Sequence, residues 1–263
     1  PQATGVLPIM IGTATRLFDF IQDKGKQYIG EIAFGMATDT QDAYGKVTET
    51  ALQPLPQQHE IEKVLEEFVG EVIQKPPAYS AIKVNGVRAY QLARKESENI
   101  VLADRVIWID EIIPLWYKQP DRMGFQVTCS KGTYIRTLCY DIGQKLHCPA
   151  HMSFLLRTKS GVFTLSQGYT LEEIQQAKEN QKLEEILLPL DMPLSHIPNI
   201  VLPESQREHC RHGRKMEADA FENLEEDGVY RLYEGKDGKR LLGIAKCQGN
   251  QVRLTTYLQS INA

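Results

Sequence analysis

The chain has 263 residues, of which 42% are apolar and 24% are charged. This composition suits one large or two unequal globular domains and excludes wholesale disorder. The 30 basic and 34 acidic residues give a formal net charge of −4, so bulk charge gives no indication of nucleic-acid binding. Any such function has to come from local basic segments.

The five cysteines have no paired spacing, which indicates reduced thiols and a cytoplasmic protein. The first uncharged run, residues 1–15, is too short to span a membrane and lacks the basic start of a signal peptide. We therefore expect no membrane association.

Hydrophobic periodicity predicts an alternation of helices and strands. Apolar residues at helical spacing predict helices at about 12–22, 61–69 and 135–146. Alternation predicts strands at 28–36, 106–116, 123–129, 229–233, 241–247 and 252–257. A run of prolines precedes the last group of strands, so we expect a domain of residues 1–195 followed by a small β-rich domain of residues 196–263.

Two basic segments stand out against the acidic average. Residues 72–95 hold five cations and no acids, with Tyr79 and Tyr90 between the cations. Residues 122–159 hold six cations against Asp141 alone. Cations interleaved with aromatic rings suit unpaired RNA, but the pattern alone favours a solvated surface loop for the first segment.

A strand-to-helix junction at Ser130–Arg136 carries the next candidate. A helix start offers free N–H groups to an anion, and Arg136 just inside it could clamp a carboxylate or form a structural salt bridge. Asp39 and Asp42 could be paired carboxylates, but a polar turn capped by its own side chains is the commoner explanation. The Cys/His clusters at 147–151 and 209–212 lack standard zinc-ligand spacing, so we expect no metal.

Several segments, in order, resemble the TruB-type tRNA pseudouridine synthases, which convert uridine-55 in the T-loop of tRNA. The matching segments are residues 1–17, Lys26–Tyr28, Thr38–Gly45, Pro76–Lys83, Cys129–Leu138 and 150–163. The resemblance implies an α+β fold with a mixed, mostly antiparallel sheet and flanking helices. It also implies an RNA-binding loop at about 75–98 and, more weakly, a PUA-like RNA-binding domain at 196–263.

The resemblance also implies the roles of individual residues. Tyr28 would stack on the flipped uridine and is a candidate for proton transfer, while Arg136 would pair with the catalytic aspartate. Tyr134 and Leu155 would wall the uridine pocket. The implied RNA-binding residues are Lys83, Arg88, Tyr90 and Lys131. The reaction needs neither cofactor nor metal, and the expected partner is the T-arm stem-loop of tRNA, bound by a cytoplasmic monomer.

The sequence departs from the family pattern at its start. In the family the catalytic aspartate lies immediately before the proline that corresponds to Pro1. We therefore expect a synthase that lacks its upstream nucleophile and is inactive as given. A noncatalytic tRNA-binding or tRNA-folding module is the alternative, because the basic segments and the C-terminal domain need no nucleophile.

Overall fold

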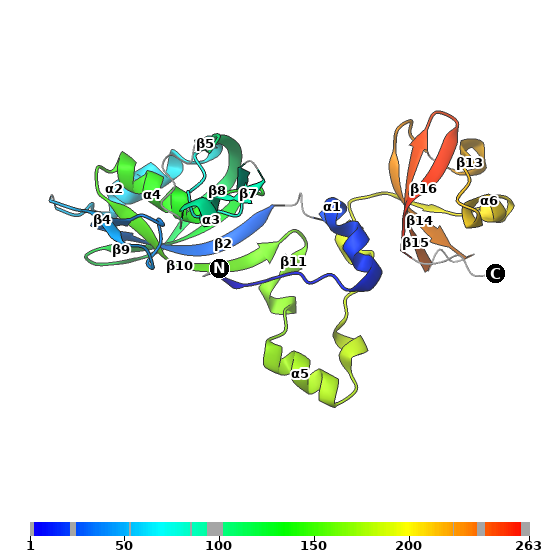
Figure 1. Cartoon of the computed structure of the whole chain (residues 1–263), viewed down its shortest axis with the longest axis horizontal. Coiled ribbons are helices and arrows are strands. Elements are labelled where there is room, and N and C mark those ends of the chain that lie inside the picture. The colour runs from blue at the N-terminus through cyan, green and yellow to red at the C-terminus, as the bar shows by residue number, and fades with distance from the viewer. Residues whose placement is uncertain are drawn as a thin grey trace. The chain divides into compact units, whose positions relative to one another are not determined.

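The computed structural model describes residues 3–21, 25–52, 54–84, 86–93, 102–222, 224–235 and 240–258. These residues form two compact units (Figure 1). The first unit is drawn from residues 1–7, 24–160 and 164–166, and the second from 8–23, 161–163 and 167–263. Residues 8–23 and 167–195 thus lie in the second unit, whereas the sequence pattern assigns them to the first domain. The functional assignment of residues 1–195 and 196–263 stays a prediction.

A seven-stranded sheet forms the centre of the first unit, in the order β1-β10-β2-β9-β8-β5 with β11 beside β10. β1 pairs with β10 in parallel, and the other pairs along this path are antiparallel. The strands are β1 (Thr4–Gly5), β2 (Lys26–Phe34), β5 (Gly70–Gln74), β8 (Arg105–Lys118), β9 (Arg122–Cys129), β10 (Ala150–Ser160) and β11 (Phe163–Thr164). The expectation of a mixed, mostly antiparallel sheet is confirmed.

Alternating apolar residues give this sheet one buried face. Met123, Phe125, Val127 and Cys129 of β9 are fully buried, as the period of two predicts. Helices α2 (Gln58–Glu66) and α4 (Ile135–Lys145) lie on the same side of the sheet (Figure 1) and share its hydrophobic core. The core therefore sits between β9 and these two helices.

Two small hairpins complete the first unit. β3 (Met36–Thr38) pairs with β4 (Val47–Thr50), and β6 (Lys83–Val84) pairs with β7 (Val87–Arg88) ahead of the short helix α3 (Ala89–Ala93). The sequence pattern predicts a polar turn around Asp39 and Asp42 and a loop at about 75–98, but not the strands β4, β6 and β7. Both hairpins are short, although Ala37 and Thr38 of the first one are buried.

The second unit contains a five-stranded sheet in the order β12-β14-β15-β16-β13. Its elements are α1 (Phe18–Ile21), α5 (Leu171–Glu179), β12 (Asn199–Val201), α6 (Arg207–Arg211), β13 (Met216–Glu217), β14 (Val229–Glu234), β15 (Arg240–Gln248) and β16 (Gln251–Tyr257), with short 3-10 turns at Gly12–Leu17, Leu165–Gln167, Leu183–Ile186, Met192–Leu194, Glu204–Gln206 and Ala218–Ala220. The predicted β-rich C-terminal region is confirmed.

The amino-terminal segment completes the core of the second unit. Leu17 is 1% exposed and packs with Leu194, Ile244 and Leu258, and the Arg16 guanidinium donates to the Tyr257 carbonyl oxygen at 2.6 Å. The amphipathic pattern at 12–22 therefore buries its apolar side against a sheet that is distant in the sequence.

All five cysteines are free and buried. Cys148 packs in the core of the first unit and Cys210 in that of the second, so these thiols act as apolar side chains. Within the described residues, no helix is long and apolar enough to cross a bilayer.

Candidate active site

The turn between β3 and β4 presents a fixed carboxylate. Gln41 has a positive φ of 63°, and the Thr38 hydroxyl donates to the Asp42 carbonyl oxygen at 2.7 Å. Asp42 Oδ1 accepts hydrogen bonds from the Thr40 hydroxyl at 2.7 Å and from the Tyr44 N–H at 3.1 Å. One oxygen of Asp42 is thus used to build the turn, which leaves Oδ2 for another partner.

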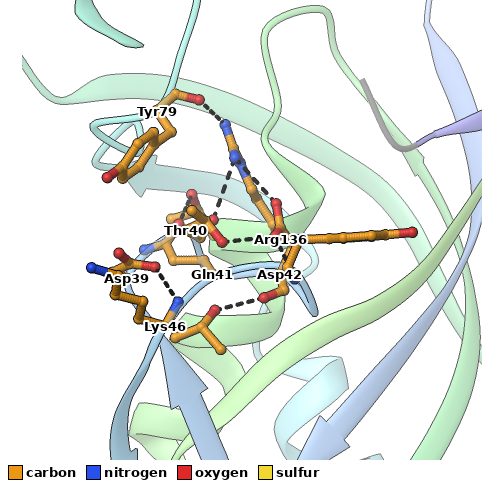
Figure 2. A network of polar contacts seen from close by, with 10 residues as sticks. Asp39, Thr40, Gln41, Asp42, Lys46, Tyr79 and Arg136 are labelled. Atoms are coloured by element: carbon orange, nitrogen blue, oxygen red, sulfur yellow. Dashed lines mark hydrogen bonds and ion pairs between the residues drawn. The ribbon is translucent and has the colours of Figure 1, made fainter. Parts of the chain in front are cut away.

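That partner is Arg136, in the first turn of α4 (Figure 2). Its Nη1 lies 3.4 Å from Asp42 Oδ2 and 3.3 Å from the Thr40 carbonyl oxygen, and its Nη2 donates to the Tyr79 carbonyl oxygen. The side chains of Arg136 and Asp42 are only 18% and 9% exposed. Three acceptors on two loops therefore hold the guanidinium in one orientation.

Arg136 remains a cation in this setting. Burial lowers the pKa of its guanidinium, and the neighbouring Asp42 carboxylate partly offsets that effect. An arginine keeps its proton under such conditions. A guanidinium has five N–H donors, and the contacts with Asp42, Thr40 and Tyr79 use its two terminal nitrogens. Among the described residues nothing else accepts from it, so capacity remains for a further anion.

The start of α4 is anchored from β5. The N-cap residue Tyr134 offers no side-chain cap. Instead, the buried Gln74 side chain accepts from the Tyr134 N–H at 2.8 Å and donates to the Tyr134 carbonyl oxygen at 3.1 Å. The Tyr134 ring centroid lies 5.9 Å from the Arg136 guanidinium carbon. This clamp fixes the predicted pocket residue Tyr134 beside the arginine.

Tyr28 and Leu155 lie on neighbouring strands of the same sheet. The Cα of Tyr28 is opposite Arg157, and that of Leu155 is opposite Gly30, so the two side chains share one face. Both are partly buried against the sheet core. Burial raises the pKa of the Tyr28 phenol, Cys129 adds to this rise and Arg157 opposes it.

The predicted RNA-binding residues lie at the surface of the first unit. Lys83 and Arg88 are exposed and directly opposite each other in the β6–β7 hairpin. Tyr90 is partly buried, and its N–H donates to the Ser80 carbonyl oxygen at 3.0 Å. Lys131 is exposed in the loop before α4. Arg94, Lys95 and the end of the predicted loop lie outside the described residues, as does Pro1.

Several contacts of this site have no local signature in the sequence. Gln74 and Tyr134 are 60 residues apart, and the Thr137 hydroxyl donates at 2.8 Å to the Gln41 side chain, 96 residues away. Asp42 did carry a signal, as one of two close carboxylates, and it serves both as a turn cap and as an ion-pair partner. No cluster of three or more potential metal ligands occurs in the described part of the chain.

Comparison with known proteins gives the family. The model of the TruB family pseudouridylate synthase N-terminal domain matches residues 1–135, and that of the tRNA pseudouridylate synthase B C-terminal domain matches residues 136–195. The chain belongs to the TruB family. Membership of this family makes it a pseudouridylate synthase, which is an isomerase. The resemblance inferred from the sequence motifs is confirmed.

Curated TruB relatives match most of the chain. The tRNA pseudouridine synthase B of Pelotomaculum thermopropionicum is 40% identical over 220 residues, which are 82% of this chain and 69% of the relative. That of Bacillus cereus is 42% identical over 219 residues, covering 81% and 71%. That of Oceanobacillus iheyensis is 38% identical over 244 residues, covering 89% and 80%.

Solved structures confirm the fold. The chain superposes with a TM-score of 0.72 and 23% identity on a protein in a crystal structure of a Cbf5-Nop10-Gar1 complex, covering 99% of this chain and 74% of that one. It superposes with a TM-score of 0.68 and 20% identity on a chain of an H/ACA RNP bound to a substrate RNA containing 2′-deoxyuridine, covering 96% and 71%. At these identities the similarity concerns the fold alone.

Proposed function

We propose that this TruB family member isomerises uridine-55 to pseudouridine in the T-loop of tRNA, acting as a monomer in the cytoplasm. The observation that carries the proposal is the buried Arg136, which three acceptors orient while it keeps donor capacity for another anion. A cation held in this way suits a reaction whose nucleophile or charge stabiliser is a carboxylate. The relatives named tRNA pseudouridine synthase B support tRNA as the substrate.

The reaction requires access to the glycosidic bond. The N1–C1′ bond of uridine breaks, the base turns, C5 bonds to C1′, and the proton on C5 is lost while N1 gains one. The uridine first has to leave the loop stack, because the stack covers these atoms. Recognition of the T-arm would rest on shape and phosphate contacts more than on a long base sequence.

The described residues fit distinct parts of this reaction. Tyr28 presents a partly buried ring for the flipped base and a hydroxyl for proton transfer. Tyr134 and Leu155 would wall the uridine pocket. Lys83, Arg88, Tyr90 and Lys131 would contact the RNA, since exposed cations neutralise phosphates and rings accept unstacked bases.

We further propose that the nucleophile is an aspartate placed directly before Pro1 in the complete enzyme. Arg136 would pair with it and favour its ionised form. The 263 residues by themselves would then bind the T-arm without isomerising its uridine-55.

A tritium-release assay tests both proposals. A T-arm stem-loop carrying [5-³H]uridine at position 55 is incubated with the chain, and with the chain extended by the upstream residues of the Bacillus cereus relative. We expect tritium release by the extended chain only, and none from an RNA labelled at a different uridine. Binding of the same RNA is measured for both proteins by filter retention.

The outcomes separate the candidates. Binding by both proteins with no release by the extended chain would favour the noncatalytic tRNA-binding module. Release by the unextended chain at the same rate would exclude the upstream aspartate. Equal release from the control RNA would contradict selection of uridine-55.

A further inference from the structure

Arg157 connects three strands at the edge of the candidate site. Its Cα lies opposite Tyr28 of β2 on one side and opposite Gly5 of β1 on the other. The Val6 N–H donates to the Arg157 carbonyl oxygen at 2.9 Å, and the Arg157 Nε–H donates to the Val6 carbonyl oxygen at 2.6 Å. Main chain and side chain of one residue therefore hold the same short segment, residues 4–6.

Glycine is required where β1 meets this arginine. Gly5 has a φ of +99°, and a Cβ at this position would lie 2.2 Å from the Arg157 carbonyl oxygen. The close approach leaves the segment little freedom to shift along β10. The position of residues 4–6 is thus set in part by Arg157, together with the buried Val6 side chain, which is 7% exposed.

Arg157 is also the cross-strand neighbour of Tyr28, so the two side chains share one face of the sheet. Burial raises the pKa of Tyr28, and the Cys129 thiol adds to this, whereas the charge of Arg157 and its hydrogen bond to the phenol act in the opposite direction. Burial keeps Cys129 protonated, with a pKa of about 11. Among the described groups that act on the Tyr28 hydroxyl, Arg157 is the cation.

We propose that Arg157 is a positioning residue of the synthase site, which fixes the Tyr28 hydroxyl and the backbone at Val6 in one arrangement. The role deepens the proposed function and rests on it, because it matters to catalysis only if Tyr28 faces the substrate. Strand β2, which carries the tyrosine, and residues 4–6 are then linked through one residue of β10. A phenol facing this cation also gives up its proton more readily than one in the same apolar surroundings.

A fluorine titration of the full chain tests the electrostatic part without RNA or turnover. 3,5-Difluorotyrosine is placed at position 28, because its phenol ionises in a milder pH range, and its pKa is followed by ¹⁹F NMR. Arg157→Gln should raise this pKa by about one unit, the size expected when a facing charge is lost. Arg157→Lys keeps the charge and should leave the pKa within a few tenths of a unit. The exposed Tyr44, labelled in the same way, is the control and should not move.

The outcomes are distinct. Equal pKa values in all three proteins would overturn the proposal, and so would a rise with Arg157→Lys as large as that with Arg157→Gln. In the extended chain, Arg157→Gln should lower kcat at least tenfold with little change in KM, and Arg157→Lys should recover part of the loss. A pKa shift without any effect on turnover would confine Arg157 to a structural role. No turnover in the extended wild type would instead contradict the proposed function.

Discussion

The planar guanidinium of Arg136 uses both of its terminal nitrogens at once. Lysine has the same charge but a single nitrogen, so it is the informative substitution. Arg136→Lys keeps the charge but loses the fork that reaches Asp42, Thr40 and Tyr79 together. In the extended chain we expect turnover to fall at least about a hundredfold, since two lost charge-assisted hydrogen bonds cost roughly 1.5–3 kcal/mol each. Single-turnover rates and the Kd for T-arm RNA measure the effect, and the Kd should change little.

A matched control comes from the same sheet. Arg122 pairs with Glu31 at 2.7 Å and is itself 40% exposed, so Arg122→Lys should leave turnover nearly unchanged. Equal rate losses for the two variants would show that the Arg136 effect is a general loss of stability.

At the residue scale, the sequence motifs located Arg136 but not its partners. The junction of strand and helix marks an arginine at a helix start, because that signal is local. Asp42 reads as a turn cap since aspartate caps turns far more often than it binds a buried cation. Gln74 carries no signal, because its two hydrogen bonds to Tyr134 join residues 60 apart in the chain.

The β6–β7 hairpin is the element whose charges can be tested most directly. Lys83 and Arg88 are exposed, paired across two short strands, and absent from the hydrophobic core. Replacing both with alanine should weaken T-arm binding and reduce the slope of log Kd against log salt by about two, since each phosphate contact releases about one counterion. Titrations at several salt concentrations measure the slope. Lys178→Ala together with Lys182→Ala, in and after α5, should leave it unchanged.

Helix α4 contains a carboxyl group that opposes folding at neutral pH. Burial raises the pKa of Asp141 from 3.8 to about 6. The folded state therefore binds this proton more tightly than the unfolded state, so stability falls as pH rises from about 4 to about 6. Asp141→Asn should raise the free energy of unfolding by about 1–2 kcal/mol at pH 7, after allowance for partial exposure, and by almost nothing at pH 3.5.

Denaturant unfolding at the two pH values measures this difference. The exposed Asp110, replaced with asparagine, is the control. Asp141 lines an open surface pocket together with Glu67, Lys75 and Lys145. An equal increase in the free energy of unfolding at both pH values would show that helix propensity, and not ionisation of Asp141, causes the effect.

At the element scale, the sequence predicted the strands and helices well, because their periodicity is local. The strands at 106–116 and 123–129 correspond to β8 and β9, and the helix at 135–146 to α4. The pattern at 12–22 was only partly right. It forms a 3-10 turn over Gly12–Leu17 and a single turn of α-helix, since the contacts of Leu17 within the second unit decide its shape.

At the scale of the whole molecule, a substitution at Leu17 tests whether the two units differ in stability independently. Leu17→Ala removes a side chain that is 1% exposed, so it should destabilise the second unit by about 2–5 kcal/mol and leave the first unaffected. Amide hydrogen-exchange rates in β14–β16 report on the stability of the second unit, and those in β8 and β9 report on the first. Ile9→Ala, in the same segment but 71% exposed, should change neither. Faster exchange in β8 and β9 would contradict the division.

The chain enters the second unit at residue 8, leaves it after residue 23 and returns to it only after residue 160. This order has a consequence for synthesis on the ribosome. Arg16 and the Tyr257 carbonyl that it contacts are 241 residues apart, so at roughly 5–20 residues per second about 12–50 s separate their emergence. For most of that interval, until β14 and β15 are made, Leu17, Phe20 and Ile21 lack their partners in these strands, while the strands of the first unit are already complete. A nascent chain stalled before β14 would therefore display this apolar stretch to chaperones, and synthesis of β14 and β15 would be the event that buries it.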